Sequence, residues 1–419
     1  MPNHLNWARN YAYNVSEIHA PETLEQVREI VVRTNRIKPL GTRHSFNDIA
    51  DSAGVHVSLQ KMNRVIDLDS MRNKVTVEAG IRYGELCAYL HQHGYALHNL
   101  ASLPHISVAG AVATGTHGSG DHNGSLATAV HAIEVVTADG DVVTFSREQQ
   151  SDEFAGAVVG LGAIGIVTKL TLDVVPSFQI SQTVYENLPL AQLKDHFDDI
   201  FSSAYSVSLF TDWKDSSFHQ LWVKHKITDA APAKTEAAIF GAAPASSHLH
   251  PVPGLGSENC SEQMGIPGPW HERLPHFRLD FTPSAGDELQ SEYIMPRQFA
   301  YDALYAIHEI RASISPLLHA SEIRTVAADD HWLSPCYEQD SVAVHFTWKA
   351  DWPAVRQVLP VIEQRLLPYR ARPHWGKLFA MGPEELQPLY EKMPDFRQLL
   401  SRYDPQGKFR NAFLDRYIY

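Results

Sequence analysis

Cysteine is scarce in this sequence. Cys87, Cys260 and Cys336 are its only cysteines, and they stand far apart among 419 residues. An odd, widely spaced set forms no disulfide framework and lacks the spacing of a zinc site. We therefore expect three ordinary reduced thiols. His248 and His250 form a pair that could ligate a metal, but no third ligand stands at a recognisable spacing, so we expect no metal site.

Long apolar runs and an excess of basic residues are also lacking. No stretch of about 18 apolar residues occurs, so we expect no membrane span. The net charge of −13 disfavours nucleic acid and anionic membranes as partners, because both need a basic face. The first fifteen residues contain no apolar run, which predicts no secretory leader and a cytoplasmic location. A monomer is the expected oligomeric state.

Short strands and helices alternate over the first part of the chain. Apolar residues at helical spacing predict a helix over residues 21–34, and a second helix over 83–93 is closed by Gly94. We expect strands at residues 37–40, 55–59, 64–68, 74–77 and 165–175, and a hairpin of residues 132–138 and 142–145 around Asp139-Gly140. This mixture favours an α+β fold over a regular βαβ array.

The pattern changes after Pro176, where longer alternating strands predominate. We expect strands at residues 206–210, 220–224, 277–281, 288–295, 322–327 and 342–348, and helices at 297–313 and 352–366. Residues 242–269 are rich in Pro, Gly, Ser and His and are expected to form a long loop. Alternating strands of this kind are typical of an antiparallel sheet with one covered face.

Residues 160–165, GLGAIG, match the G-x-G-x-x-G pattern of dinucleotide-binding folds. That pattern binds pyrophosphate only when it follows a strand and opens a helix. Here the order is reversed, because a helix is predicted at 154–159 and a strand after 165. We therefore expect no nicotinamide-type site, and interpret these glycines as a tight turn.

Two other glycine-rich segments are better candidates for phosphate binding. The first glycine-rich segment, residues 41–47, directly follows a predicted strand, and its backbone N–H groups can form a nest for an anion. The second glycine-rich segment, residues 107–120, is built from small residues and carries the hydroxyls of Ser107, Thr114 and Thr116. Either segment alone could be an ordinary surface turn; the presence of both favours a binding site.

Polar residues alternate along two predicted strands. Glu322 and Arg324 are two positions apart and point to the same face of their strand, as do His345 and Thr347 on the next one. Four polar groups on one face are costly in a core unless they form a site or pair with each other. A structural ion pair beside a packed histidine is the alternative interpretation.

Taken together, these segments resemble the vanillyl-alcohol-oxidase superfamily of flavoproteins, and within it the branch that oxidises alditols. The matching segments are GTRHSFN (41–47), ASLPHISVAG (101–110), ATGTHGSG (113–120), EIRTVAAD (322–329), HFTW (345–348), HWGK (374–377) and DPQGKF (404–409) with Asn411. The resemblance runs from about residue 5 to about residue 415. It implies an FAD-binding domain at residues 1–176, a substrate domain with an antiparallel sheet at 177–372, and a C-terminal segment, 373–419, that returns to the FAD domain.

The resemblance also implies how the cofactor is held. FAD is expected to be bound covalently through His44, by a single bond because the second glycine-rich segment contains no cysteine. Many members have Gly where this chain has Arg43, which raises the backbone cost if φ is positive there; the guanidinium would face the FAD phosphates. The other expected cofactor-binding residues are Gly41, Thr42, Ser45, Ser102, Ser107, Gly110, Thr114, Gly115, Thr116, His117, Val167 and His374.

The activity implied by the resemblance is oxidation of the terminal hydroxyl of an alditol, such as xylitol or sorbitol, to the aldose, with reduction of O₂ to H₂O₂. Arg324 and Lys377 are expected to hold the reacting hydroxyl, and Glu322 to accept a hydrogen bond from its neighbour. Ser102, Gln290 and Thr347 would orient the polyol, and His345 would assist proton removal, although the sequence does not identify the base. His271 and His276 are interpreted as structural.

Three other functions stay open at this point. The first is an aldonolactone oxidase of the same superfamily, and the second is a polyol dehydrogenase that excludes oxygen. The third, from a different class, is a flavin-binding protein without catalytic activity. The polar cluster of the two strands argues against the third.

Overall fold

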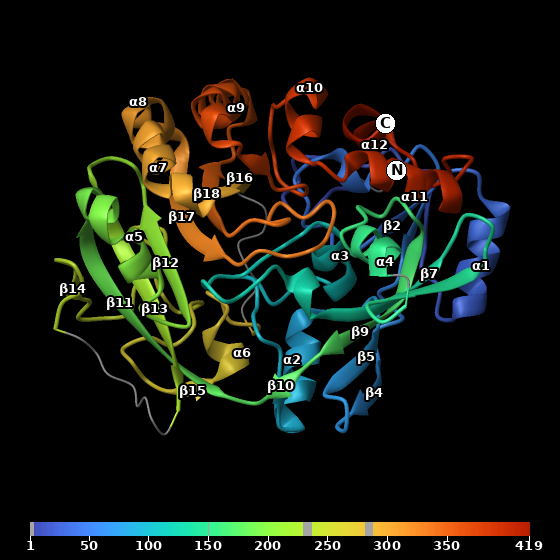
Figure 1. Ribbon diagram of the computed structural model, residues 1–419, viewed down its shortest axis with the longest axis horizontal. Helices are drawn as coiled ribbons and strands as arrows, with labels where there is room; N and C mark the ends of the chain where they lie inside the picture. The colour runs from blue at the N-terminus through green and yellow to red at the C-terminus, as the bar shows by residue number, and fades with distance from the viewer. Residues whose placement is uncertain (1–3, 150, 229–236, 281–287) are drawn as a thin grey trace.

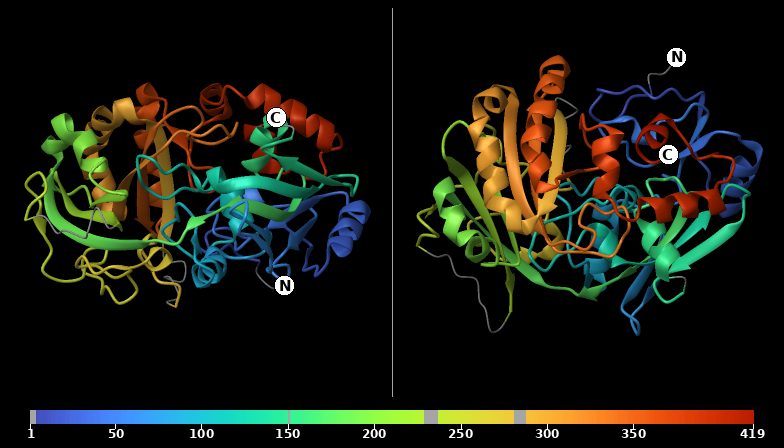
Figure 2. Two further views of the ribbon diagram at one scale, coloured as in Figure 1. Left: turned by 60° about the horizontal axis from the view of Figure 1, so that its bottom comes forward. Right: turned by 45° about the horizontal axis from the view of Figure 1, so that its top comes forward.

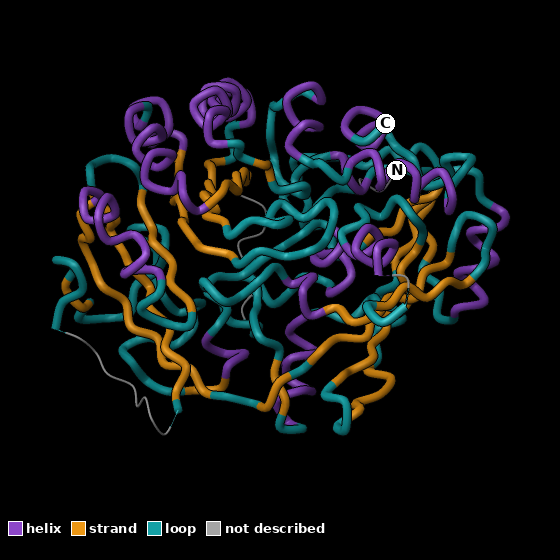
Figure 3. The backbone as a smooth tube through the Cα atoms, in the orientation of Figure 1, coloured by secondary structure: helices purple, strands orange, loops and turns teal. Residues whose placement is uncertain are grey.

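The computed structural model describes residues 4–149, 151–228, 237–280 and 288–419. Its strands gather in two regions, and loops fill the middle of the molecule between them (Figures 1 and 3). One region holds a three-stranded and a five-stranded sheet, and the other holds a sheet of nine strands. The elements therefore combine paired strands and helices, and the α+β expectation is confirmed.

The first region is built from the N-terminal part of the chain. A parallel sheet contains β1 (Glu17–His19), β3 (Val55–Ser58) and β2 (Ile37–Leu40), in that order. An antiparallel sheet contains β4 (Val65–Asp69), β5 (Lys74–Glu78), β9 (Ile166–Asp173), β7 (Val130–Val136) and β8 (Val142–Ser146), in that order. Helices α1 (Leu24–Arg33), α2 (Tyr83–Gln92) and α4 (Ser151–Val158) flank these sheets, and the short strands β6 (Tyr95–Ala96) and β10 (Val175–Pro176) pair with each other.

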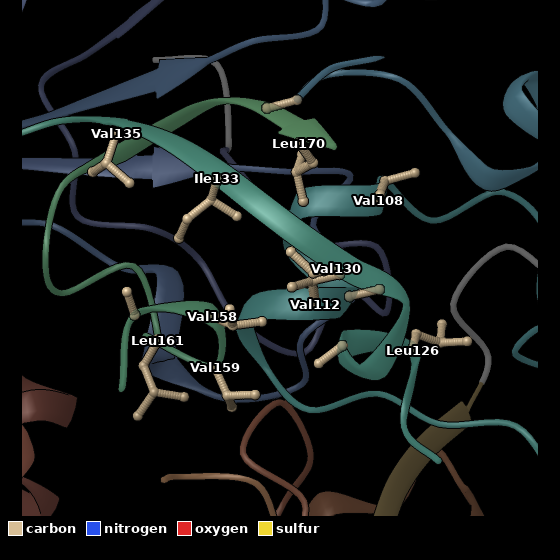
Figure 4. Packing of buried hydrophobic residues seen from close by; sticks show 14 of the residues in the cluster. Val108, Val112, Leu126, Val130, Ile133, Val135, Val158, Val159, Leu161 and Leu170 are labelled. Carbon is tan, nitrogen blue, oxygen red and sulfur yellow. The ribbon is translucent and has the colours of Figure 1, made fainter. Parts of the chain in front are cut away.

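A short helix, α3 (Val108–Ala113), lies inside the core of this region. Its side chains Val108 and Val112 pack among Val130 and Ile133 of β7 and Leu170 of β9 (Figure 4). Because branched apolar side chains hold α3 against the sheet, the second glycine-rich segment has a fixed position.

The nine-stranded sheet is antiparallel and runs in the order β14-β11-β13-β12-β17-β18-β16-β19, with β15 also paired to β11. Its strands are β11 (Gln179–Pro189), β12 (Ser206–Thr211), β13 (Ser217–Ile227), β14 (Ala243–Pro244), β15 (Gly268–Pro269), β16 (Glu288–Pro296), β17 (Leu318–Val326), β18 (Ser341–Lys349) and β19 (Arg372–Pro373). Helices α5 (Leu193–Phe201), α7 (Ala300–Glu309) and α9 (Trp352–Leu366) cover one face (Figure 2).

The two faces of this sheet differ in polarity. Ile323 of β17 and Val344 and Phe346 of β18 share one apolar core with the covering helices. Since side chains alternate across a strand, Glu322 and His345 lie on the opposite face. That polar face is turned toward the first region and supplies one wall of the site described below.

The C-terminal segment returns to the first region. Helix α11 (Met393–Tyr403) lies beside α4, and α10 (Pro383–Leu386) lies beside α12 (Ala412–Tyr417) (Figure 1). Phe396 and Leu400 of α11 and Phe413 of α12 share the core of Val27 in α1.

One sequence prediction of secondary structure was wrong, and one predicted helical segment is interrupted. Residues 277–280 form no strand; Phe277 makes one isolated bridge with Cys260, and Phe281 lies outside the described residues. The backbone N–H groups of His276 and Phe277 both donate to the carbonyl of Ser102 instead of to a strand. The helix expected at 297–313 is divided into a 3₁₀ turn (Arg297–Phe299), α7 and α8 (Arg311–Ile314).

The glycine pattern at residues 160–165 lies, as expected, between a helix, α4, and a strand, β9. Leu161 and Gly162 both adopt left-handed backbone angles there, with φ of 54° and 61°. The segment is thus a tight turn. Among the described residues no helix has the length and apolarity needed to cross a bilayer.

Candidate active site

A cavity of about 1020 Å³ lies where the polar face of the large sheet meets the first region. Both glycine-rich segments line it, together with β16, β17, β18 and residues 374–377. Ligand cavities are typically about 300–1,000 Å³, so this one is large enough for a bulky cofactor. The predicted site residues that line it are Gly41, Thr42, Arg43, His44, Ser45, Ser102, Ser107, Gly110, Thr114, Thr116, His117, Val167, Gln290, Glu322, Arg324, His345, Thr347, His374 and Lys377.

Gly115 is the predicted site residue that does not line the cavity. Its φ is +66°, and an added Cβ would lie 2.9 Å from Cδ of Pro335. The glycine is needed for a left-handed turn in close contact with Pro335, so its role is in the shape of the segment.

His44 lines this cavity, and one of its ring nitrogens has no partner among the described residues. Its Nδ1 lies 3.0 Å from the hydroxyl of Thr42, whereas Nε2 is buried without a hydrogen-bond partner among the described residues. The ring stacks on Trp7 with 5.2 Å between ring centroids. Burial, and next the neighbouring His105, lower the pKa of His44 to about 4. The imidazole is therefore neutral at pH 7 and keeps a nucleophilic lone pair.

The two glycine-rich segments approach each other closely beside His44. An added Cβ at Gly41 would lie 2.6 Å from Oγ of Ser107, and one at Gly110 would lie 2.8 Å from the same atom. The backbone N–H of Ser107 donates to the hydroxyl of Thr42 over 3.2 Å. A side chain at either glycine would fill the space along the backbone. Because both positions are glycine, a bulky, phosphate-containing ligand can approach the backbone N–H groups.

Arg43 occupies the left-handed region of the backbone, with φ of 65°. The N-terminal segment donates two hydrogen bonds to backbone carbonyls of this turn. The N–H of Trp7 donates to the carbonyl of Arg43, and the amide of Asn6 donates to the carbonyl of Ser45. These bonds offset the backbone cost that is expected for a residue other than glycine. The arginine is thus compatible with the turn and lines the cavity.

At the other end of the cavity, residues from three strands form a transverse row. Glu322 of β17 pairs in register with His345 of β18, and His345 pairs with Glu292 of β16. Glu292 is buried and was not among the predicted site residues. Its Oε2 lies 2.6 Å from Nζ of Lys377, and its Oε1 lies 3.1 Å from Nη2 of Arg324. One carboxylate thus holds both predicted catalytic cations.

Lys377 also fixes the tautomer of His345. Its ammonium lies 2.8 Å from Nδ1 of His345, which must accept because the ammonium can only donate. The Nε2–H then donates to the hydroxyl of Thr347, 3.1 Å away. Burial, followed by Lys377, lowers the pKa of His345 to about 3, so the ring is neutral. Both ring nitrogens are engaged.

Glu322 is held from behind by a second pair of buried groups. Nε2 of His276 lies 2.6 Å from Oε1 of Glu322, and Nζ of Lys224 lies 3.3 Å from Nδ1 of His276. Burial by itself would raise the pKa of Glu322, but Arg324 and His276 outweigh it and hold this pKa well below its usual range. His276, which was expected to be structural, lines the cavity and supports Glu322 there; His271 does not line it and lies against His91.

The remaining predicted substrate residues come from separate elements. Nη1 of Arg324 donates to the hydroxyl of Ser102 over 3.3 Å. Gln290 of β16 is in register with Thr347 of β18 and donates to Glu288. No cluster of three or more potential metal ligands occurs in the described part of the chain.

The comparisons with known proteins agree with this geometry. Residues 16–146 match the family "FAD binding domain", and residues 287–417 match the family "D-arabinono-1,4-lactone oxidase". The fold resembles cholesterol oxidase from B. sterolicum, with a TM-score of 0.78 and 16% identity over 99% of this chain and 96% of that one. The cavity, its unpartnered imidazole and the FAD domain define an FAD-dependent oxidoreductase with the two-domain fold of the vanillyl-alcohol-oxidase superfamily.

A closer relationship follows from the whole sequence. The chain is 48% identical over 412 residues to alditol oxidase of Streptomyces sp. (strain IKD472 / FERM P-14339), which covers 98% of this chain and 97% of the relative. The chain belongs to the alditol oxidase family. A further similar fold is glucooligosaccharide oxidase of Acremonium strictum, described with a 6-S-cysteinyl, 8α-N1-histidyl FAD, at a TM-score of 0.75 and 16% identity over 98% of this chain and 93% of that one.

Proposed function

We propose that this enzyme oxidises the terminal primary hydroxyl of an alditol, such as xylitol or sorbitol, to the aldose and reduces O₂ to H₂O₂. The observation that carries the proposal is the polar end of the cavity, where Arg324 and Lys377 meet on Glu292 beside Glu322. The similarity to alditol oxidase over nearly the full chain supports the same activity. Under this proposal the enzyme acts as a cytoplasmic monomer on a neutral polyol, without nucleic acid or a membrane.

The cofactor of this proposal is FAD, linked covalently through His44. The neutral imidazole of His44 in the cavity lining supports the link, as does the histidyl FAD of glucooligosaccharide oxidase. The backbone of the two glycine-rich segments and Arg43 would hold the phosphates. When bound, FAD accepts a hydride from the substrate carbon. The chain has no cysteine in the second glycine-rich segment that could form a second bond.

Side chains of the large sheet, together with Ser102 and Lys377, bind and activate the alcohol. Arg324 and Lys377 donate to the reacting oxygen and stabilise the negative charge that grows on it as its proton leaves. Oε1 of Glu322 is engaged by His276, so the second carboxylate oxygen accepts a hydrogen bond from the adjacent substrate hydroxyl. Ser102, Gln290 and Thr347 orient the remaining hydroxyls.

We propose for His345 a different part from the assistance in proton removal that is expected from the sequence. Its Nδ1 accepts from Lys377 and its Nε2–H donates to Thr347, so no ring nitrogen is available to accept a proton. We therefore assign His345 the positioning of Lys377 rather than the role of the base.

A peroxide assay tests the activity. Hydrogen peroxide and oxygen uptake are measured with xylitol, sorbitol, glycerol and an aldonolactone as substrates. The proposal requires one peroxide per polyol oxidised. Faster turnover of the lactone would assign the enzyme to lactone oxidation, the second candidate, which the match at residues 287–417 favours. Turnover with an artificial acceptor alone would indicate a dehydrogenase, and a flavin that no polyol bleaches would indicate a protein without this activity.

The covalent link is tested on denatured protein. We expect the wild-type chain to retain flavin fluorescence on a denaturing gel after acid treatment, and His44→Ala to lose it. Total flavin before denaturation serves as the control, since the variant keeps the cavity. A wild-type chain that releases all of its flavin on denaturation would contradict attachment through His44.

A further inference from the structure

Glu292 connects more charged groups of the active site than any residue predicted from the sequence. Its two oxygens contact Lys377 and Arg324, and its backbone carbonyl accepts the N–H of His374, which anchors the segment that carries Lys377. Oε1 of Glu292 also lies 3.4 Å from Nε2 of His117 in the second glycine-rich segment. The positions of both catalytic cations therefore depend on this carboxylate, and so does the charge of Lys377.

The four charged side chains that contact one another at this end of the cavity balance in charge; Lys224 lies outside this group, behind His276, and burial lowers its pKa to about 7. Arg324 and Lys377 contribute two positive charges, and Glu292 and Glu322 contribute two negative ones, all of them buried or nearly so. His345 and His276 are neutral, since burial lowers the pKa of each. An added anion would leave one uncompensated negative charge in a buried site, which is costly, whereas a neutral polyol changes nothing.

We propose that Glu292 is a positioning residue that sets the substrate class: by pairing with Arg324 and Lys377 it reserves the site for neutral polyols and rejects sugar acids. This inference rests on the proposed function. The same pairing distinguishes the aldose from the aldonate. The aldose is neutral, whereas the aldonate carries a carboxylate that competes with Glu292 for Arg324 and Lys377.

The first test measures the binding of an anion. In Glu292→Gln the site gains one net positive charge while the shape of the side chain is kept. We expect xylonate to bind at least about tenfold more tightly than to the wild type, as judged by perturbation of the flavin absorbance. Glu292→Asp retains the charge and should bind xylonate as weakly as the wild type, even where the shorter side chain slows turnover.

The second test is the pH dependence of flavin reduction by xylitol. Glu292 raises the pKa of Lys377 against the lowering by burial. Its removal should therefore shift the basic limb of the rate profile downward by about one to two pH units, because the reaction needs the protonated amine. The titratable and charged groups that face Lys377 are Glu292, Glu322, Arg324, His345 and His374, with His117 beyond Glu292.

A matched control is Glu363→Gln. Glu363 is buried on the opposite side of β16, where it accepts from Tyr293 and from the N–H of Ala380. Its replacement should change neither xylonate binding nor the pH profile. Equal xylonate affinity in the wild type and a folded, flavin-loaded Glu292→Gln would overturn the proposal. Binding is measured without turnover, so a failure of polyol oxidation in the wild type would count against the proposed function and not against this charge balance.

Discussion

Lys377 is the residue on which the proposed chemistry depends most directly. A primary alcohol is a poor hydride donor until its proton begins to leave, and a fixed cation stabilises that state more than the neutral substrate. We expect Lys377→Met to slow flavin reduction by xylitol about 10²–10³-fold, as in other enzymes that lose one such donor. Stopped-flow absorbance measures the reduction.

The same substitution removes the ion-pair partner that lies 2.6 Å from Oε2 of Glu292. Collapse of the site is therefore the competing explanation, and the flavin content and thermal unfolding of Lys377→Met distinguish the two. A stable, flavin-loaded variant that is reduced at the wild-type rate would remove Lys377 from the mechanism.

Single site residues were predictable from the sequence when polar residues two positions apart on one predicted strand indicated a shared face. Glu322 and Arg324 share a face because they are two positions apart, and the structure brings them within 3.5 Å. Glu292 carried the same signal, since it stands two positions after Gln290 on a predicted strand, but only the register of β16 against β18 places it beside His345. His276 lies in a segment without regular structure, so only the folded chain brings it to Glu322.

Among the elements, strands and helices with a strong period were predicted within a few residues of their observed bounds. α9 (Trp352–Leu366) and β18 (Ser341–Lys349) are examples: α9 has one buried face, and β18 alternates polar and apolar residues although both of its faces are buried. The prediction of a strand at 277–281 was wrong, because the backbone there bonds to a loop and not to a strand. The N–H groups of His276 and Phe277 both donate to the carbonyl of Ser102. Alternation predicts a strand only where a partner strand is available.

The junction between elements of the two regions depends on Arg297. Its guanidinium pairs with both oxygens of Asp121, beside the second glycine-rich segment, and with Asp198 of α5. Asp121 also accepts from the hydroxyl of Thr325 in β17. Because Arg297 and Asp121 are largely buried, Arg297→Ala leaves a carboxylate without its main partner. We expect it to lower the free energy of unfolding by about 2–4 kcal/mol, measured by urea denaturation.

Lys61→Ala is the matched control for that prediction. It removes an ion pair with Glu22 in which both side chains are more than half exposed. Exposed pairs contribute only about 0–1 kcal/mol, so this variant should unfold close to the wild type. Equal effects of the two substitutions would show that the junction is not a stabilising contact.

At the scale of the whole molecule, several buried or half-buried histidines are held in the neutral form. The sequence contains 23, and burial is the first cause that lowers the pKa to about 4 for His44, His56, His98, His271 and His276. Some serve the cavity, but His56 lies outside it: its Nε2–H donates to the carbonyl of Ala50, and its ring packs edge-on against Tyr13.

These histidines make the fold sensitive to acid. Each has a folded-state pKa below its ordinary value of about 6.5, so the unfolded chain binds more protons between these two values. Stability is therefore complete above about pH 6.5 and is lost as the pH falls toward 4. For His56 alone the loss amounts to about 2 kcal/mol between pH 6.5 and 5. We expect His56→Gln, whose amide can still donate to Ala50, to lose correspondingly less stability than the wild type over that interval. Urea midpoints at both pH values measure the difference, with His122→Gln, at an exposed position, as the control. Parallel loss in the wild type and His56→Gln would mean that His56 is not protonated on unfolding and that acid acts on the carboxylates instead.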